Sequence, residues 1–296
     1  MLVRYRIPLK YFIRFAYVDA IVVLLVSIGV FFTIRKIDFP IIPINIPAFM
    51  GTAISLLLGF KLSQSYDRWW EARKIWGAIV NDSRTLTMQL LNYHTDGKCE
   101  ITERMAMRQA GWSHSLGQSL RGLSPLGKLD EFISAEELAR ISEHSNIPLA
   151  LLNEQSADLK RIFRDGKVNE YQQIQIDKTL VRLCESMGRA ERIKNTVFPT
   201  TYRLFLHLFI YLFITLLAVA LAEVDRLWEI PLLVLISLPF FLLEKTALYL
   251  QDPFENRPTD VSVSAIAHTI ELNIKQLLSR DDLPAKKPVL DDFFVM

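Results

Sequence analysis

The chain has 296 residues, of which 51% are hydrophobic and 22% are charged, and its formal net charge is +2. This composition excludes an intrinsically disordered chain and a collagen-like sequence. The near-neutral charge gives no global basic excess of the kind that indicates nucleic acid as a partner. The two cysteines are Cys99 and Cys184. Two thiols in so long a chain indicate a reducing compartment and no disulfide framework.

Four apolar segments, joined to a large charged part, predict a membrane protein. They cover residues 20–34, 46–60, 204–222 and 230–243, and the mean hydropathy of the whole chain is +0.22. A straight span needs about 20 residues, so we expect amphipathic flanks to complete the second and fourth segments inside a helix bundle. The chain is therefore predicted to cross a lipid bilayer four times.

The distribution of basic residues predicts the orientation, because short cytoplasmic flanks carry excess Lys and Arg. Basic residues precede the first span and follow the second, whereas the link 223–229 has one arginine against three acidic residues. We expect a multi-pass protein of the inner membrane with both termini in the cytoplasm. The flanking basic residues are Arg4, Arg6, Lys10 and Arg14 before the first span, and Lys61, Arg68, Arg73 and Lys74 after the second.

The long segment 65–196 is predicted to be helical throughout. Ser134 followed by Glu137 forms a capping box, Asn146 before Pro148 marks another helix start, and Gly166 marks a helix end. No stretch alternates as strands do. The fold class is therefore all-α.

No motif in the chain supports catalysis or a cofactor. The five histidines are far apart, and there is no Walker loop, no GxSxG and no dinucleotide fingerprint. We predict no enzyme, no metal site and no cofactor. His207, inside the third span, is either a pore or proton-relay group or, as we favour, a histidine hydrogen-bonded between helices. For Asp19 we likewise favour a structural partner, such as Arg14 or a neighbouring helix.

The second span has a stripe of small residues. Gly51, Ser55, Gly59 and Ser63 recur at every fourth position, which places them on one side of a helix. Such a stripe lets helix backbones approach closely in membranes. We predict that Gly51, Ser55 and Gly59 are helix-packing residues.

Thr52, Leu56 and Phe60 form a second stripe beside the first. If several copies of this helix surround an axis, these side chains make a narrow hydrophobic constriction that gates ions by dewetting. The alternative, which spacing alone favours, is that Leu56 and Phe60 pack in a bundle core.

Three pieces of sequence resemble the bestrophin family of ion channels. The first is LLLGF at 56–60 with SYDRWWEAR at 65–73, the second is GRAERIKNTVFPTTY at 188–202, and the third is Asp-Pro-Phe at 252–254. Their order and spacing match the family from about residue 5 to 280.

The resemblance implies a homopentamer around one central pore, with four membrane helices per subunit continuous with a helical cytoplasmic domain. The neck positions of the family fall on Thr52, Leu56 and Phe60, where eukaryotic members carry bulky apolar side chains; Thr52 is smaller and polar. A second, cytoplasmic constriction falls on Ile174, with Tyr171 and Ile176 as alternatives.

This resemblance organises the chain into four parts. Residues 1–64 hold the N-terminal segment and the first two membrane helices, of which 46–64 is the pore helix. Residues 65–196 form the helical cytoplasmic domain, residues 197–248 the last two membrane helices, and residues 249–296 a cytoplasmic C-terminal segment.

Animal relatives open with calcium, which an acidic run after the Asn/Asp-Pro-Phe motif holds. Here that run has only Glu255 and Asp260 as carboxylates, with Arg257 between them. A hard cation needs several oxygens and little nearby positive charge, so we predict no calcium clasp.

The function that follows is a channel for small monovalent ions, with chloride conduction as the family default. Lys61 near the inner end favours anions, whereas Asp67 and Glu71 favour cations, so a sodium-selective channel stays as the alternative. A membrane-anchored helical scaffold or sensor is the alternative from another class of protein.

Overall fold

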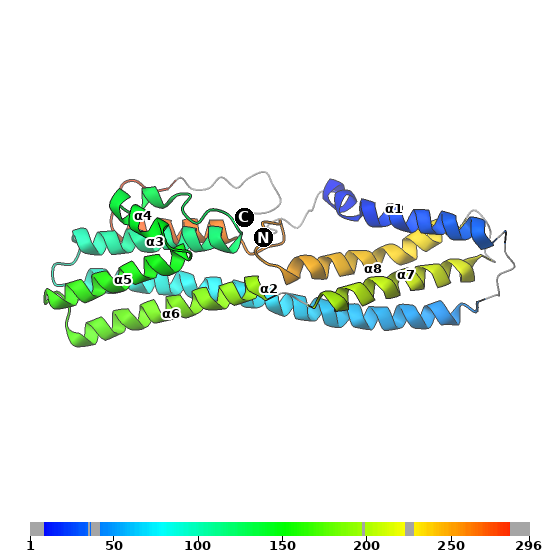
Figure 1. Ribbon diagram of the computed structural model, residues 1–296, viewed down its shortest axis with the longest axis horizontal. Helices are drawn as coiled ribbons and strands as arrows, with labels where there is room; N and C mark the ends of the chain where they lie inside the picture. The colour runs from blue at the N-terminus through cyan, green and yellow to red at the C-terminus, as the bar shows by residue number, and fades with distance from the viewer. Residues whose placement is uncertain (1–8, 35, 37–41, 197–198, 223–227, 285–296) are drawn as a thin grey trace. The chain divides into compact units, whose positions relative to one another are not determined.

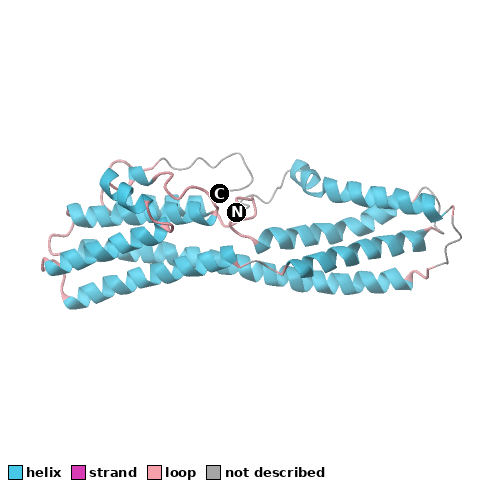
Figure 2. Cartoon of the chain, in the orientation of Figure 1, coloured by secondary structure: helices cyan, strands magenta, loops and turns pink. Residues whose placement is uncertain are grey.

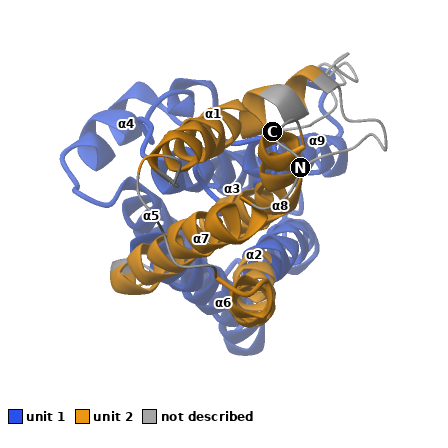
Figure 3. Ribbon diagram, turned by 90° about the vertical axis from the view of Figure 1, so that its right-hand side faces the viewer, with its two compact units in different colours: residues 1–3, 70–196, 253–296 blue, residues 4–69, 197–252 orange. Residues whose placement is uncertain are grey.

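The computed structural model describes residues 9–34, 36, 42–196, 199–222 and 228–284. These residues form helices joined by turns, and none of them lies in a strand (Figure 2). Figure 1 labels the first eight α-helices and Figure 3 also labels α9. The helices are α1 (Leu9–Ile34), α2 (Asn45–Tyr93), α3 (Glu100–Leu120), the short 3-10 helix η1 (Leu129–Glu131), α4 (Ala135–Ser142), α5 (Ile147–Arg164), α6 (Glu170–Asn195), α7 (Thr200–Leu221), α8 (Glu229–Gln251) and α9 (Val263–Leu277). The predicted all-α class is confirmed.

The chain divides into two compact units, coloured separately in Figure 3. The first, called the membrane unit below, consists of residues 4–69 and 197–252. The second, called the polar unit, consists of residues 1–3, 70–196 and 253–296.

The membrane unit contains four helices that are long and apolar enough to cross a membrane, at the four places that the sequence predicts. The second and fourth are longer than their apolar segments, because α2 has 49 residues and α8 has 23. Helices α1, α7 and α8 pack on one another, and α2 contributes Ile54 and Leu58 to the same apolar core (Figure 1). The amphipathic flanks therefore complete the short spans as helix.

Helix α2 continues without interruption past the apolar segment. Pro47 lies in its first turn, where proline is tolerated, and no later proline breaks it. The predicted boundary between residues 64 and 65 therefore falls inside one helix.

The polar unit is built around α3, which packs on α5, α6, α9 and η1. Gly111 permits this packing, because a Cβ there would lie 2.9 Å from the Cβ of Phe132. Trp112 beside it is fully buried and donates from Nε1 to the carbonyl of Pro148 at 3.0 Å. A small residue and a large one thus set the spacing of α3 from its neighbours.

A buried charge cluster also joins these helices. Arg108 of α3 donates from Nη2 to Glu137 at 2.9 Å and from Nη1 to Asp158 at 2.9 Å and Gln155 at 3.1 Å. Its side chain is 2% exposed. One arginine therefore ties α3 to both α4 and α5, although no local sequence pattern predicts this.

The predicted helix ends in this unit are confirmed. Ser134 accepts a hydrogen bond from the backbone of Glu137, Asn146 accepts one from Leu149, and Gly166 has a φ of +70° just after α5. Only the serine half of the predicted capping box forms, because the carboxylate of Glu137 binds Arg108 instead. Arg4, Arg6 and residues 223–227 of the link lie outside the described residues.

Candidate functional site

The stripe predicted to line a pore lies on the surface of the single chain. Thr52, Leu56 and Phe60 are all exposed, Leu56 by 61% and Phe60 by 58%. They do not pack in the core of their own subunit, so that alternative is wrong for the chain by itself. Phe49, seven residues before Leu56, continues the stripe and is also exposed, although the sequence analysis missed it.

Thr52 is less polar in this setting than its residue type suggests. Its hydroxyl donates to the carbonyl of Ala48 at 3.0 Å, one turn earlier in α2. The donor is therefore satisfied within the helix, as is common for threonine in membrane helices.

The three small residues lie in two different environments. Gly51 is buried against α7, since a Cβ there would lie 3.1 Å from Cε2 of Phe213. Ser55 is exposed, and a Cβ at Gly59 would meet no atom within 4 Å. Gly51 thus packs inside the subunit, whereas Ser55 and Gly59 present open helix surface.

The exposed face of α2 differs in kind from that of α7. On α7 the exposed side chains from 204 to 212 are large and mostly apolar: Leu204, Phe205, Leu208, Phe209, Tyr211 and Leu212. Thr215 is also exposed, and its hydroxyl donates to the carbonyl of Tyr211 at 2.9 Å. On α2, small and polar residues lie among the apolar ones: Ser55, Gly59, Ser63 and Asp67. The apolar face of α7 is suited to lipid, because placing polar groups in hydrocarbon costs free energy. The face of α2 is suited to water or to another protein chain.

Lys61 does not belong to this exposed face. Its ammonium is buried and lies 2.8 Å from Oε1 of Glu244 on α8. His207 on α7 lies with Nε2 at 3.6 Å from the other oxygen of Glu244, and its Nδ1 lies 3.0 Å from the carbonyl of Arg203. The expectation that Lys61 favours anions is therefore wrong on geometry, because its charge is paired inside the bundle. His207 thus lies beside a carboxylate of a neighbouring helix, but its hydrogen bond is to its own helix, so the predicted hydrogen bond between helices is not observed.

Asp19 has a partner on a neighbouring helix, as expected. Its Oδ2 lies 3.4 Å from Nζ of Lys245 on α8. Of the acidic residues after the span, Asp67 is exposed on the face of α2 that carries Phe60, seven residues away. Glu71 pairs with Lys74 at 2.6 Å.

The three candidates for a cytoplasmic constriction on α6 have different environments. Ile174 is 51% exposed and Tyr171 is 83% exposed, whereas Ile176 is completely buried in the polar unit. Ile176 is therefore a core residue and cannot line a pore. Ile174 and Tyr171 keep the surface position that a constriction requires.

The two carboxylates at 255–260 both have partners. Glu255 pairs with Lys194 at 2.7 Å, and the hydrogen bond from Lys194 lowers the pKa of its carboxyl. Asp260 accepts from the backbone N–H of Arg257 at 3.0 Å, and burial raises its pKa. Among the described residues, no three His, Cys, Asp or Glu side chains are grouped as metal ligands.

Comparison with known proteins matches this architecture to one family. A family model described as bacterial/fungal bestrophin protein matches residues 5–276. The voltage-dependent anion channel-forming protein YneE of Salmonella typhi is 30% identical over 260 residues, which cover 86% of this chain and 83% of that protein. A voltage-dependent anion channel-forming protein of Ralstonia nicotianae is 26% identical over 247 residues, which cover 82% of this chain and 81% of the relative.

Comparison with a solved structure gives the same family. The crystal structure of a bacterial bestrophin homologue from Klebsiella pneumoniae has a TM-score of 0.82 to this chain at 27% identity, and the match covers 88% of this chain and 97% of that one. The family model spans nearly the whole sequence and the helical fold agrees with that structure. The chain therefore belongs to the bacterial/fungal bestrophin family, a family of ion channels and not of enzymes.

Proposed function

We propose that this chain is the subunit of a homopentameric anion channel with chloride as its ion. The observation that carries the proposal is the exposed face of α2, which holds Ser55, Gly59, Ser63 and Asp67 in a span whose neighbours expose large apolar residues. The names of the relatives, which are anion channel-forming proteins, support the choice of ion.

In this proposal five copies of α2 surround the pore. Thr52, Leu56 and Phe60 form successive rings of a hydrophobic neck, which resists ion passage because ions do not enter a dry apolar constriction. Their exposure on the single chain supports this role. Because the hydroxyl of Thr52 bonds to Ala48, the outermost ring is less polar than its residue type suggests.

The open surface at Ser55 and Gly59 is suited to close contact with a neighbouring subunit. Small residues let two helix backbones approach. Gly51 has a different role, because it packs on Phe213 of its own chain. On α6 we propose Ile174 as the cytoplasmic constriction, with Tyr171 as the alternative.

Selectivity depends on charge outside the apolar rings. Lys61 is paired with Glu244, so its ammonium does not face the ions. Asp67 is the exposed acidic residue below Phe60, and a ring of carboxylates attracts cations. A sodium-selective channel is therefore the second candidate, favoured by this one residue against the names of the relatives.

For the location we propose the inner membrane, with both ends of the chain in the cytoplasm. The four apolar helices and the basic flanks of the first two support this arrangement.

Planar bilayer recording in asymmetric sodium chloride tests the ion. An anion channel gives a reversal potential near the chloride equilibrium value, and a cation channel gives one of opposite sign. If the current is cationic, Asp67→Asn is expected to move the reversal potential towards zero. A mass in detergent of about five times the 34.1 kDa chain supports the assembly, whereas a monomer that passes no current indicates the scaffold or sensor.

A further inference from the structure

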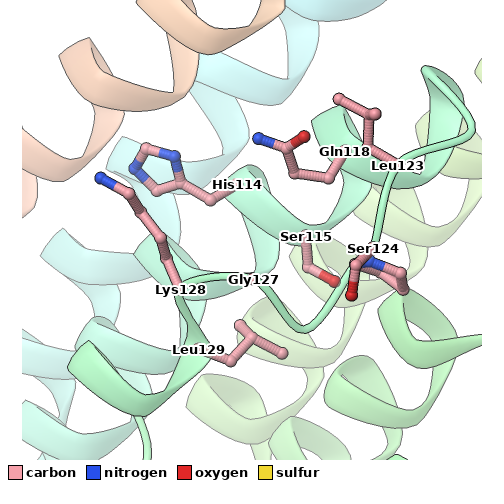
Figure 4. A pocket seen from close by; sticks show the side chains of 9 residues that line it. His114, Ser115, Gln118, Leu123, Ser124, Gly127, Lys128 and Leu129 are labelled. Carbon is pink, nitrogen blue, oxygen red and sulfur yellow. The ribbon is translucent and has the colours of Figure 1, made fainter.

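The polar unit contains a cavity that the channel proposal does not use. Its volume is about 290 Å³, and it lies between the C-terminal half of α3 and the loop that follows (Figure 4). His114, Ser115 and Gln118 come from α3, and Leu123, Lys128 and Leu129 come from the loop and the start of η1. A volume near 300 Å³ is at the lower end of the range for small-molecule sites.

A buried hydroxyl in the wall of this cavity lacks a hydrogen bond. Ser115 is 1% exposed, and its Oγ has no hydrogen-bond partner among the described residues. A buried polar atom of this kind is costly unless something bonds to it. Gln118 lies three residues further on the same face of α3, so its amide faces the same side of the helix.

His114 is oriented by a carboxylate beside the cavity. Its Nε2 lies 3.0 Å from Oε2 of Glu271 on α9, and Lys275 lies 3.0 Å from the other oxygen. Burial acts to raise the pKa of Glu271, but the hydrogen bonds from His114 and Lys275 outweigh it and the pKa is lowered. The ionised carboxylate can only accept, so Nε2 carries a proton. Glu271 is thereby neutralised by its own partners.

The walls of the cavity are apolar except for these groups, the hydroxyl of Ser124 and one cation. Leu123 and Leu129 supply apolar surface, and none of the described lining residues is acidic. Lys128, which is exposed, supplies an ammonium. The cavity therefore combines apolar walls, one positive charge and one buried hydroxyl.

We propose that this cavity binds a small organic carboxylate that carries a second polar group. The carboxylate binds Lys128, the apolar body lies against Leu123 and Leu129, and the second polar group bonds to Ser115. Inorganic anions fit less well, because they would leave the apolar walls without contacts. The ligand site is separate from the exposed face of α2, and the proposal stands whether the channel passes anions or cations.

Ligand-observed NMR titration of the full-length protein in nanodiscs tests this site with three probes. para-Hydroxyphenylacetate has both polar groups, its amide lacks the charge, and phenylacetate lacks the hydroxyl. We expect para-hydroxyphenylacetate to bind about fivefold more tightly than its amide and about tenfold more tightly than phenylacetate.

Two variants assign these differences to residues. Lys128→Gln is expected to remove the preference for the acid over the amide, and Ser115→Ala the preference for the hydroxylated probe. Lys160→Gln, at an exposed lysine that lines another cavity of the polar unit, is the matched control and is expected to change neither. Retained preferences in Lys128→Gln and Ser115→Ala, equal binding of all three probes, or no binding at millimolar concentration would each overturn the proposal.

Discussion

Removal of the Lys61 ammonium tests the buried charge pair of the membrane unit. The side chain of Lys61 is 0% exposed and that of Glu244 is 5% exposed, with 2.8 Å between their charged atoms. Removing one partner of such a pair costs about 3–5 kcal/mol, because the other charge stays buried without compensation. His207 at 3.6 Å offsets part of this cost, so for Lys61→Met we expect a loss of about 3 kcal/mol.

The second half of the test removes both charges. Lys61→Met combined with Glu244→Met leaves no buried charge, so we expect its stability to return to within about 1 kcal/mol of the parent. Lys245→Met is the comparison variant, because that lysine is 23% exposed and lies 3.4 Å from Asp19. It also donates to the backbone carbonyl of Phe15, so its loss should cost about 1–2 kcal/mol, less than the loss of Lys61. The assay is equilibrium unfolding by SDS in mixed micelles, followed by tryptophan fluorescence. The reasoning fails if Lys61→Met costs no more than Lys245→Met, or if the double variant is as unstable as the single one.

Three further predictions concern the neck and the polar unit. The double variant Leu56→Ala with Phe60→Ala should raise ion flux into vesicles about tenfold, which corresponds to a barrier lowered by about 1.4 kcal/mol. The control Leu208→Ala should leave the flux unchanged. Equal flux in the parent, the double variant and the control would show that the neck is not the barrier. Folding lowers the pKa of Glu271, so its contribution to stability is complete above the ordinary pKa of 4.5 and is lost as the pH falls through the lower pKa of the folded state. In melting curves from pH 7 down to about 3, the melting temperature of Glu271→Gln should therefore fall less than that of the parent. Arg108→Met leaves carboxylates buried without their arginine and should lower the unfolding free energy by about 3–5 kcal/mol, and a loss below about 1 kcal/mol would argue against the buried cluster.

Local patterns in the sequence were enough to predict the elements. The four spans follow from runs of apolar residues, and the caps at Ser134, Asn146 and Gly166 follow from side chains that satisfy the backbone at a helix end. Helical periodicity groups Thr52, Leu56 and Phe60 on one side of α2, but spacing alone favours core packing for them, and only the structure shows that this side is exposed.

The partners of charged residues could not be predicted, because they come from distant parts of the chain. Lys61 and Glu244 are 183 positions apart, so no local pattern around Lys61 indicates its partner. Arg108 bonds to helices 29 and 50 residues further on, and no local pattern marks it as buried.

The residue of α6 that forms the cytoplasmic constriction could not be predicted from local sequence either. Ile174 and Ile176 are both β-branched and apolar, and only the packing of α6 in the polar unit separates the buried one from the exposed one. Two residues along a helix correspond to a rotation of about 200°. A shift of two residues in the match to the family therefore selects the opposite face of α6.

Water access to position 56 tests the central claim most directly. In a protein whose Cys99 and Cys184 are replaced by serine, Leu56→Cys is compared with Leu208→Cys, since both leucines are similarly exposed on the single chain, at 61% and 57%. A charged, water-soluble methanethiosulfonate reagent is applied during bilayer recording. We predict that the current changes irreversibly in Leu56→Cys and stays constant in Leu208→Cys. A constant current in Leu56→Cys, with its thiol unmodified by mass spectrometry, would contradict a water-filled pore lined by α2.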